Sequence, residues 1–434
     1  MKKLPIALVM SVLLGGVPLL AVQSVSAAEE SAENSEEEAS AGPRVRRTMT
    51  LREIVFEKLE EAQQAADAGN FDEALQTLER LEKRKRNSYE RAMTHSMYAY
   101  VYSTQENYAA AIPEYAKVIE IDNAPDSLKQ TTRYTLAKLY MLQERYAESL
   151  ATINEWMSQS DKINADAYMF RAQVQYQQEE YELAGDDIAT AISMREEAGS
   201  RVTESWLLLQ RAVMFQLKDY DGLAETLEKL VATYSKSEYW MQLAAVYNEL
   251  GREDEELATL ETAYDQSLFS KEPEYLNFAQ ALLSREIPYK AAHVLEAGMD
   301  ADIVEKSARN LSLLGDAWML AKEYDNAIVV MTQAADASGE GRDYFKLAQI
   351  YTERQEWSKS LEFSNKALNA GDLKAPYQAL IIKGLAQYNL DQLEAASVTF
   401  FKAASYPAAE KVAHQWQDYI ESEQQRREYI ANAG

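Results

Sequence analysis

Pairs of small residues twelve positions apart recur along this chain and constrain its fold more than any other feature. Both members of a pair are Ala, Gly or Ser, and an aromatic residue usually precedes the second member by three positions. Two short antiparallel helices approach closely only where their side chains are small, so each pair predicts the crossing point of a helical hairpin. The eight clear pairs are Ala62/Ala74, Ala99/Ala111, Ala137/Ser149, Ala172/Ala184, Ala279/Ala291, Gly315/Ala327, Ala348/Ser360 and Gly384/Ala396.

The spacing of the pairs predicts a stack of hairpins. Where the pairs are clear they recur every 33 to 38 residues, which is enough chain for two helices and two turns. One hairpin cannot bury its apolar face alone, whereas stacked hairpins form a continuous core. The chain has only 15 Gly and 9 Pro among its 434 residues, which argues against a fold rich in strands and tight turns.

This pattern resembles the tetratricopeptide repeat (TPR), over roughly residues 52–407. The clearest units read Trp240-x-x-Leu243-Ala244-x-x-Tyr247-x-x-x-Gly251 and Leu314-Gly315-x-x-Trp318-x-x-x-x-x-Tyr324-x-x-Ala327. The resemblance implies an all-α TPR α-solenoid, a right-handed superhelix of about ten helical hairpins. A C-terminal capping helix is expected at residues 408–430, where apolar side chains follow helical spacing after Pro407.

The repeat pattern also divides the chain. We expect an N-terminal TPR half at residues 51–198, irregular units that form a hinge at 199–270, and a C-terminal TPR half at 271–407. In the irregular part, Gln210 and Arg211 lie near the expected small position, and Glu253 and Glu256 replace the aromatic and the second small residue.

The N-terminus has the order of a secretory signal peptide. Lys2 and Lys3 precede an apolar run over residues 6–22, and small residues end the segment. Residues 1–28 are therefore predicted to be a signal peptide cleaved after Ala27 or Ala28, although a retained single anchor is the alternative. Residues 29–50 are expected to be a disordered linker, acidic and then basic. Export predicts a periplasmic protein.

Composition and motifs give no support to catalysis. Cysteine is absent, which excludes disulfides, thiolate metal sites and thiol catalysis, and the net charge of −26 repels nucleic acid. His95, His293 and His414 fall in different units without metal-ligand spacing, so neither a metal nor a cofactor is expected. Acidic pairs such as Asp186–Asp187 are interpreted as solvated helix faces. We therefore predict no enzyme, and a carboxylate enzyme in a solenoid cleft stays an unsupported alternative.

The TPR resemblance implies that the first helix of each unit lines a concave groove that binds a protein or an extended peptide. Tyr offers contact area at low entropic cost and Met adapts to irregular shapes, so both suit such a groove. Each residue could instead pack between neighbouring helices. The candidate groove residues are Met93, Tyr100, Tyr134, Lys138, Met141, Met169, Gln173 and Tyr176.

Three segments, residues 87–115, 287–299 and 317–328, suggest a narrower resemblance. They are similar to periplasmic TPR proteins encoded beside TonB–ExbB–ExbD systems in marine Gram-negative bacteria. That resemblance implies a non-catalytic accessory of TonB-dependent energy transduction and iron uptake. Its partners would be TonB-, ExbB- or ExbD-type subunits, through peripheral association with an inner-membrane complex. The alternative is a TPR scaffold for cell-envelope assembly, serving outer-membrane protein insertion or peptidoglycan synthesis.

Overall fold

The computed structural model describes residues 51–433, and the chain divides into two units between Arg52 and Glu53. The predicted signal peptide at 1–28 and the predicted linker at 29–50 lie outside the described residues. Within the described part there are 21 α-helices and no strands, as the repeat pattern predicts. None of these helices is both long enough and apolar enough to cross a bilayer.

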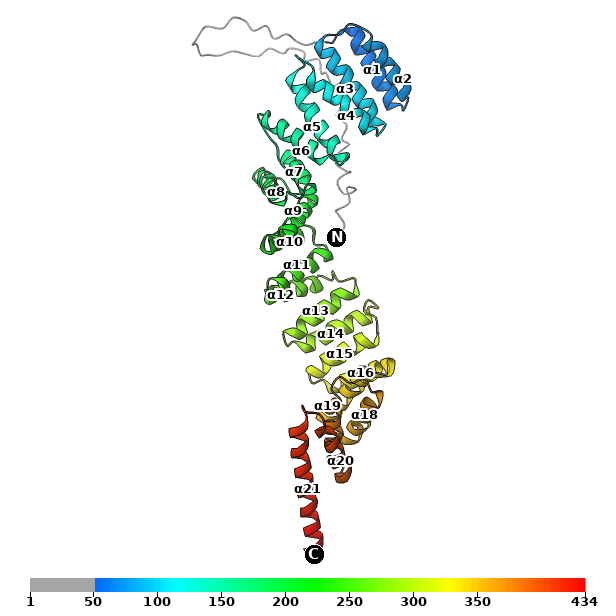
Figure 1. The fold of residues 1–434 in the computed structure, drawn as a ribbon, viewed down its shortest axis with the longest axis vertical. Helices are drawn as coiled ribbons and strands as arrows, with labels where there is room; N and C mark the ends of the chain where they lie inside the picture. The colour runs from blue at the N-terminus through cyan, green and yellow to red at the C-terminus, as the bar shows by residue number, and fades with distance from the viewer. Residues whose placement is uncertain (1–50, 434) are drawn as a thin grey trace, which may run out of the picture. The chain divides into compact units, whose positions relative to one another are not determined.

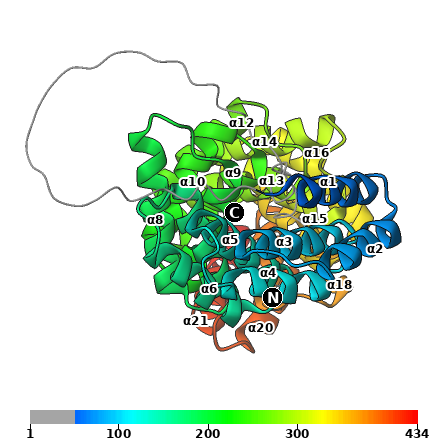
Figure 2. The ribbon, with the colours of Figure 1, turned by 90° about the horizontal axis from the view of Figure 1, so that it is seen from above.

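Twenty of the helices pair into ten antiparallel hairpins, which we number 1 to 10, and neighbouring hairpins lie side by side in chain order (Figures 1 and 2). Hairpins 1 to 5 are α1 (Glu53–Asp67) with α2 (Phe71–Glu82), α3 (Ser88–Thr104) with α4 (Tyr108–Glu120), α5 (Asp126–Leu142) with α6 (Tyr146–Ser158), α7 (Ala165–Gln177) with α8 (Tyr181–Glu197), and α9 (Glu204–Leu217) with α10 (Tyr220–Tyr234). Hairpins 6 to 10 are α11 (Ser237–Glu249) with α12 (Glu253–Asp265), α13 (Glu272–Ser284) with α14 (Pro288–Asp300), α15 (Ala308–Leu320) with α16 (Tyr324–Ser338), α17 (Gly341–Glu353) with α18 (Trp357–Ala370), and α19 (Pro376–Asn389) with α20 (Leu393–Ala404). The last helix is α21 (Glu410–Ala433).

The small pairs lie where the two helices of a hairpin cross, as predicted. All sixteen residues of the eight pairs are buried. In hairpin 3 the two members touch, because the Ser149 hydroxyl donates a hydrogen bond of 2.7 Å to the Ala137 carbonyl. In hairpin 10 a methyl group added to Gly384 would come within 2.6 Å of the Phe400 ring. A larger side chain at these positions would force the helices apart.

Each hairpin turns through one residue in the left-handed backbone region. Only two of these ten residues, Gly69 and Gly251, are glycine, which adopts that conformation without steric cost. The other eight are Glu106, Glu144, Glu179, Lys218, Glu286, Lys322, Gln355 and Asp391. The turn is therefore imposed by the packing of the two helices it joins.

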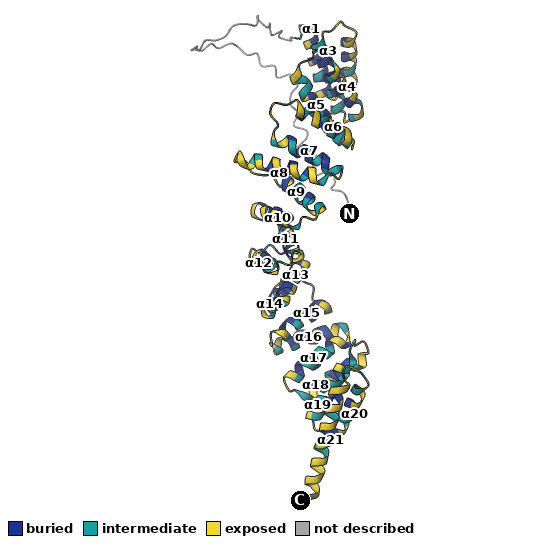
Figure 3. Cartoon of the chain, turned by 60° about the vertical axis from the view of Figure 1, so that its left-hand side comes forward, coloured by how far each residue is buried: buried dark blue, intermediate teal, exposed yellow. Residues whose placement is uncertain are grey.

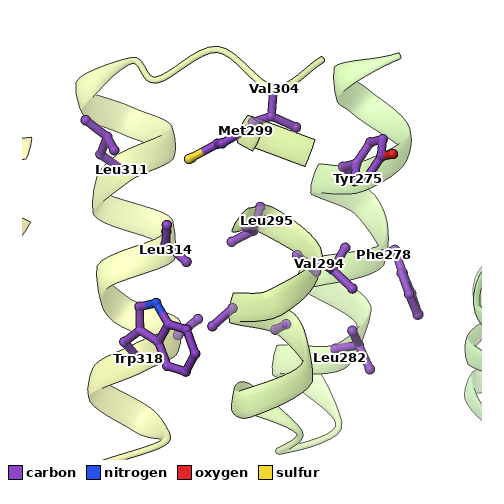
Figure 4. Close-up of a cluster of buried hydrophobic side chains, with 14 of the residues drawn as sticks. Tyr275, Phe278, Leu282, Val294, Leu295, Met299, Val304, Leu311, Leu314 and Trp318 are labelled. Atoms are coloured by element: carbon purple, nitrogen blue, oxygen red, sulfur yellow. The ribbon is translucent and has the colours of Figure 1, made fainter. Parts of the chain in front are cut away.

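Apolar side chains from successive hairpins share continuous clusters. One cluster joins α7 to α11, a second joins α11 to α17, and Trp240 packs against both. Figure 4 shows part of the second cluster, where Leu295 and Met299 lie between the side chains of α13 and those of α15. This sharing holds one hairpin to the next, as expected for a solenoid.

The C-terminal helix caps hairpin 10, as predicted from its apolar spacing. The Trp416 ring stacks on Phe400 of α20 with centroids 5.5 Å apart, and Ala409, Ala413 and Ile420 are buried beside it. The end of α21 is exposed, with Tyr429 75% accessible (Figure 3).

Hairpin 5 departs from the small-residue rule. Arg211 lies seven residues before the turn at Lys218, the place that Ala172 holds relative to Glu179 in hairpin 4. Its guanidinium donates to the Gln242 side chain of α11 at 2.8 Å. Helices α9 and α10 still pair, and a hinge in residues 199–270 stays a prediction.

Candidate functional site

The candidate groove residues lie on three first helices of consecutive hairpins. Met93 and Tyr100 belong to α3, whereas α5 and α7 carry the other six. Met93 and Met169 are only 6% and 2% exposed, so they pack between helices and offer little contact surface. The remaining six are half-buried, and we call them the A-face: Tyr100, Tyr134, Lys138, Met141, Gln173 and Tyr176.

Tyr134 and Lys138 form the centre of the A-face. The Lys138 ammonium lies 4.5 Å from the centroid of the Tyr134 ring, a cation–π distance. The ring also packs against Trp156 at 4.9 Å and Phe170 at 5.8 Å, which fixes its orientation. Burial raises the pKa of Tyr134 to about 12, and the nearby carboxylate of Asp166 adds to this.

Lys138 has no ion pair within the described part of the chain. Burial lowers the pKa of the Lys138 ammonium, and the charge of Asp166 opposes this shift. A cation on an aromatic ring, held by no carboxylate of its own, keeps hydrogen-bonding capacity for a ligand.

The other aromatic members of the A-face take part in packing as well. The Tyr100 hydroxyl donates a hydrogen bond to Asp67 of α1, and this bond and burial raise the pKa of Tyr100. The Tyr176 ring lies 5.5 Å from Tyr181, the first residue of α8. Both side chains therefore hold neighbouring helices together while keeping part of their surface accessible.

The interpretation of Asp186–Asp187 as a solvated face is wrong for Asp187. Its carboxylate is 5% exposed and accepts two hydrogen bonds from Arg171, at 2.6 and 2.7 Å. Arg171 also donates to Asn154 of α6 at 3.1 Å. This bidentate pair joins α7 to α8 and α6, and the hydrogen bond from Asp187 raises the pKa of Arg171.

A second network of polar side chains, which the sequence pattern does not predict, joins hairpins 8 and 9. Asp343 is fully buried and accepts hydrogen bonds from Ser312 at 2.9 Å and Ser338 at 2.8 Å. Lys346 donates to Ser312 at 2.9 Å and to Asp316 at 2.7 Å. Burial raises the pKa of Asp316 even though Lys346 opposes the shift. These bonds cross from hairpin 8 to hairpin 9, and their donors and acceptors satisfy one another.

Two of the three histidines, His95 and His293, form local contacts. The Nδ1 atom of His95 lies 2.7 Å from Glu114, which also accepts from Lys117, and His293 lies against Glu296. Over residues 51–433 no three metal-binding side chains gather in one place.

Two stretches of the chain, residues 59–127 and 134–199, match a family model for the tetratricopeptide repeat. The hairpins form a TPR solenoid. The matched stretches include every residue of the A-face, which therefore lies on the first helices of TPR units.

Solved structures of TPR proteins are similar to parts of this solenoid. A tetratricopeptide repeat protein from Parabacteroides merdae is 17% identical, covers 58% of this chain and 93% of its own, and gives a TM-score of 0.34. The C-terminal part of a TPR repeat-containing protein from Cytophaga hutchinsonii is 13% identical, with coverages of 57% and 99% and a TM-score of 0.39. YrrB, described as a TPR protein with an unusual peptide-binding site, is 14% identical, with coverages of 45% and 99% and a TM-score of 0.38. No curated protein sequence matches this chain.

Proposed function

We propose that this TPR solenoid is a non-catalytic scaffold that binds an extended segment of another protein along the A-face. The observation that carries this proposal is the Tyr134–Lys138 pair, a half-buried aromatic ring and a cation without a carboxylate of its own. Tyrosine is enriched among the residues that dominate protein interfaces, because its rigid ring buries much area at low entropic cost.

The finer proposal places this scaffold in the periplasm, as an accessory of a TonB-dependent energy-transduction and iron-uptake system. Its support comes from the sequence: the signal-like order of residues 1–28 and the resemblance of residues 87–115, 287–299 and 317–328. A chain with a net charge of −26 also attracts basic periplasmic segments, which are typical of TonB-like partners.

A triple substitution tests binding along the A-face. Changing Tyr100, Tyr134 and Tyr176 together to Ala should weaken partner capture about a hundredfold, if each truncation costs roughly 1 kcal/mol. The matched control replaces three half-buried tyrosines that begin second helices of hairpins. These control residues are Tyr108, Tyr146 and Tyr220. Unaltered capture by the A-face triple would contradict the proposal.

A second variant separates binding from folding, because Tyr134 also packs against Trp156 and Phe170. Lys138→Gln alone keeps every ring and removes only the ammonium, which forms no ion pair within residues 51–433, so circular dichroism and melting should stay close to those of the parent. Its capture of the partner should still fall, since charge-assisted hydrogen bonds are lost.

In-cell crosslinking followed by mass spectrometry identifies the partner. TonB, ExbB or ExbD subunits crosslinked to the A-face support the finer proposal. Crosslinks to enzymes of outer-membrane protein insertion or peptidoglycan synthesis contradict it and favour the envelope-assembly scaffold. Fractionation of the same cells tests the periplasmic location directly.

A further inference from the structure

Two lysines of hairpin 10 have no carboxylate partner. Lys383 of α19 is half-buried and Lys402 of α20 is exposed, and neither forms an ion pair or a side-chain hydrogen bond within residues 51–433. Burial lowers the pKa of the Lys383 ammonium, and the like charge of Lys402 adds to this shift.

Hairpin 4 shows how the same position is neutralised elsewhere in this solenoid. Arg171 of α7 pairs with Asp187, sixteen residues later on α8, through two hydrogen bonds of 2.6 and 2.7 Å. Lys383 occupies the place of Arg171, because each lies eight residues before the turn residue of its hairpin. In hairpin 10 the place of Asp187 holds Thr399, whose hydroxyl donates to Gln387 at 2.6 Å instead. The carboxylate that closes the pair in hairpin 4 is therefore missing here.

Two large exposed apolar side chains lie on the same helix as Lys402. Val398 and Phe401 precede Lys402 by four and one positions on α20, and they are 56% and 70% exposed. Val398, Phe401 and Lys402 share one side of α20, while Ala396 and Phe400 on the opposite side are buried, with Phe400 stacked on Trp416 of α21. Exposed apolar area rimmed by polar groups is typical of a protein-binding surface.

We propose that these four residues, Lys383, Val398, Phe401 and Lys402, bind an acidic segment of a partner protein that also carries a large apolar side chain. We call them the hairpin-10 face. One carboxylate of the partner pairs with Lys383, as Asp187 pairs with Arg171, and the apolar side chain packs on Phe401. The surface lies in a different hairpin from the A-face and does not rest on the function proposed for it.

The charge of the chain favours a protein over a membrane or a nucleic acid as the occupant. Extended anionic surfaces are repelled by the net charge of −26, whereas a short acidic segment presents few charges to that field and can pair with the two lysines.

Selection of short random peptides displayed on phage, with the purified full-length protein as bait, tests the proposal. The selected peptides should combine Glu or Asp with a large apolar residue, and their binding should weaken with added salt. Fluorescence anisotropy with one such peptide should show about tenfold weaker binding to Phe401→Ala and to Lys402→Ala, two exposed substitutions that leave the core intact. The matched controls, Phe215→Ala and Lys411→Ala, are exposed on other helices and should bind unchanged.

Thr399→Asp gives the sharpest variant, because it restores the carboxylate that hairpin 4 has at Asp187. The internal acid should pair with Lys383 and weaken peptide binding about tenfold, while melting shows that the protein stays folded. Equal binding to the parent protein and to Thr399→Asp would overturn the proposal. So would selected peptides without acidic residues, the absence of any bound peptide, or binding to phosphatidylglycerol vesicles alone. Peptide binding that survives in the A-face triple variant keeps this test independent of the proposed function.

Discussion

Two identical substitutions, Gly384→Ala and Gly185→Ala, should change stability in opposite directions. Both glycines lie inside helices, α19 and α8, where replacing Gly by Ala gains about 0.5–1 kcal/mol of helix stability. Their surroundings differ. A methyl group on Gly185 would lie 3.6 Å from Val213 and 4.0 Å from Leu217, which are ordinary contacts. Gly185→Ala should therefore stabilise the protein by about 0.5–1 kcal/mol.

At Gly384 the same methyl group would lie 2.6, 2.8 and 2.9 Å from three atoms of the Phe400 ring. The ring cannot move away easily, because it is fully buried and stacked on Trp416 with planes only 5° apart. Overpacking of this kind costs about 1–3 kcal/mol, which exceeds the gain in helix propensity. We expect Gly384→Ala to destabilise hairpin 10 and α21 by about 1–2 kcal/mol.

Hydrogen exchange measured by mass spectrometry suits this prediction, because a solenoid does not unfold as one cooperative unit and its ends open locally. Amides of α19 to α21 should exchange about tenfold faster in Gly384→Ala, whereas those of α8 and α9 should slow in Gly185→Ala. Phe400→Leu replaces the ring with a smaller side chain and makes room for the added methyl group. In a double-mutant cycle, Phe400→Leu with Gly384→Ala should therefore destabilise the protein less than the sum of the two single changes. Unchanged exchange in α19 to α21 of Gly384→Ala would refute the reasoning from close packing.

Two further predictions concern a turn and the C-terminal helix. Gln355 is exposed at a φ of 60°, so Gln355→Gly should stabilise hairpin 9 locally by about 1 kcal/mol. Gly251→Ala, at a φ of 68°, should destabilise hairpin 6 by a similar amount, and amide exchange within each hairpin measures both effects. Arg426 and Arg427 lower the pKa of Glu423 to about 2. This lowered pKa stabilises α21 above the ordinary value of 4.5, and the effect is lost as pH falls toward 2, so Glu423→Gln should abolish that part of the pH dependence of amide exchange in α21.

The sequence predicts the hairpins well because their crossing points demand small side chains. Every predicted pair, from Ala62/Ala74 to Gly384/Ala396, is buried. The turns are harder to predict, since residues such as Glu144 and Lys322 give no local signal for the left-handed backbone. Helix packing imposes that conformation, and packing is not a property of the four or five residues around the turn.

The candidate site is less predictable than the fold, for a reason particular to solenoids. A first helix contacts its own second helix and the helices of both neighbouring hairpins, so apolar residues occur on most of its sides. Periodicity alone could not separate the buried Met93 and Met169 from the half-buried Tyr134. Asp187 looked solvated because its partner Arg171 lies sixteen residues earlier, and only the hairpin register brings the two together.

In a repeat protein, equivalent positions of different hairpins can be compared with one another. Equivalent positions in different hairpins share a backbone environment, so a difference between them reflects the side chains and what those side chains contact. Arg171 pairs with Asp187 within its own hairpin, whereas the position equivalent to Asp187 in hairpin 10 is Thr399, and Lys383 forms no ion pair within residues 51–433. Stacking of the hairpins depends on the apolar side chains that neighbouring hairpins bury against each other. It does not require a cation that forms no ion pair. Lys138 on the A-face and Lys383 on the hairpin-10 face are half-buried cations that form no ion pair within residues 51–433, and for this reason both enter the proposals for partner binding.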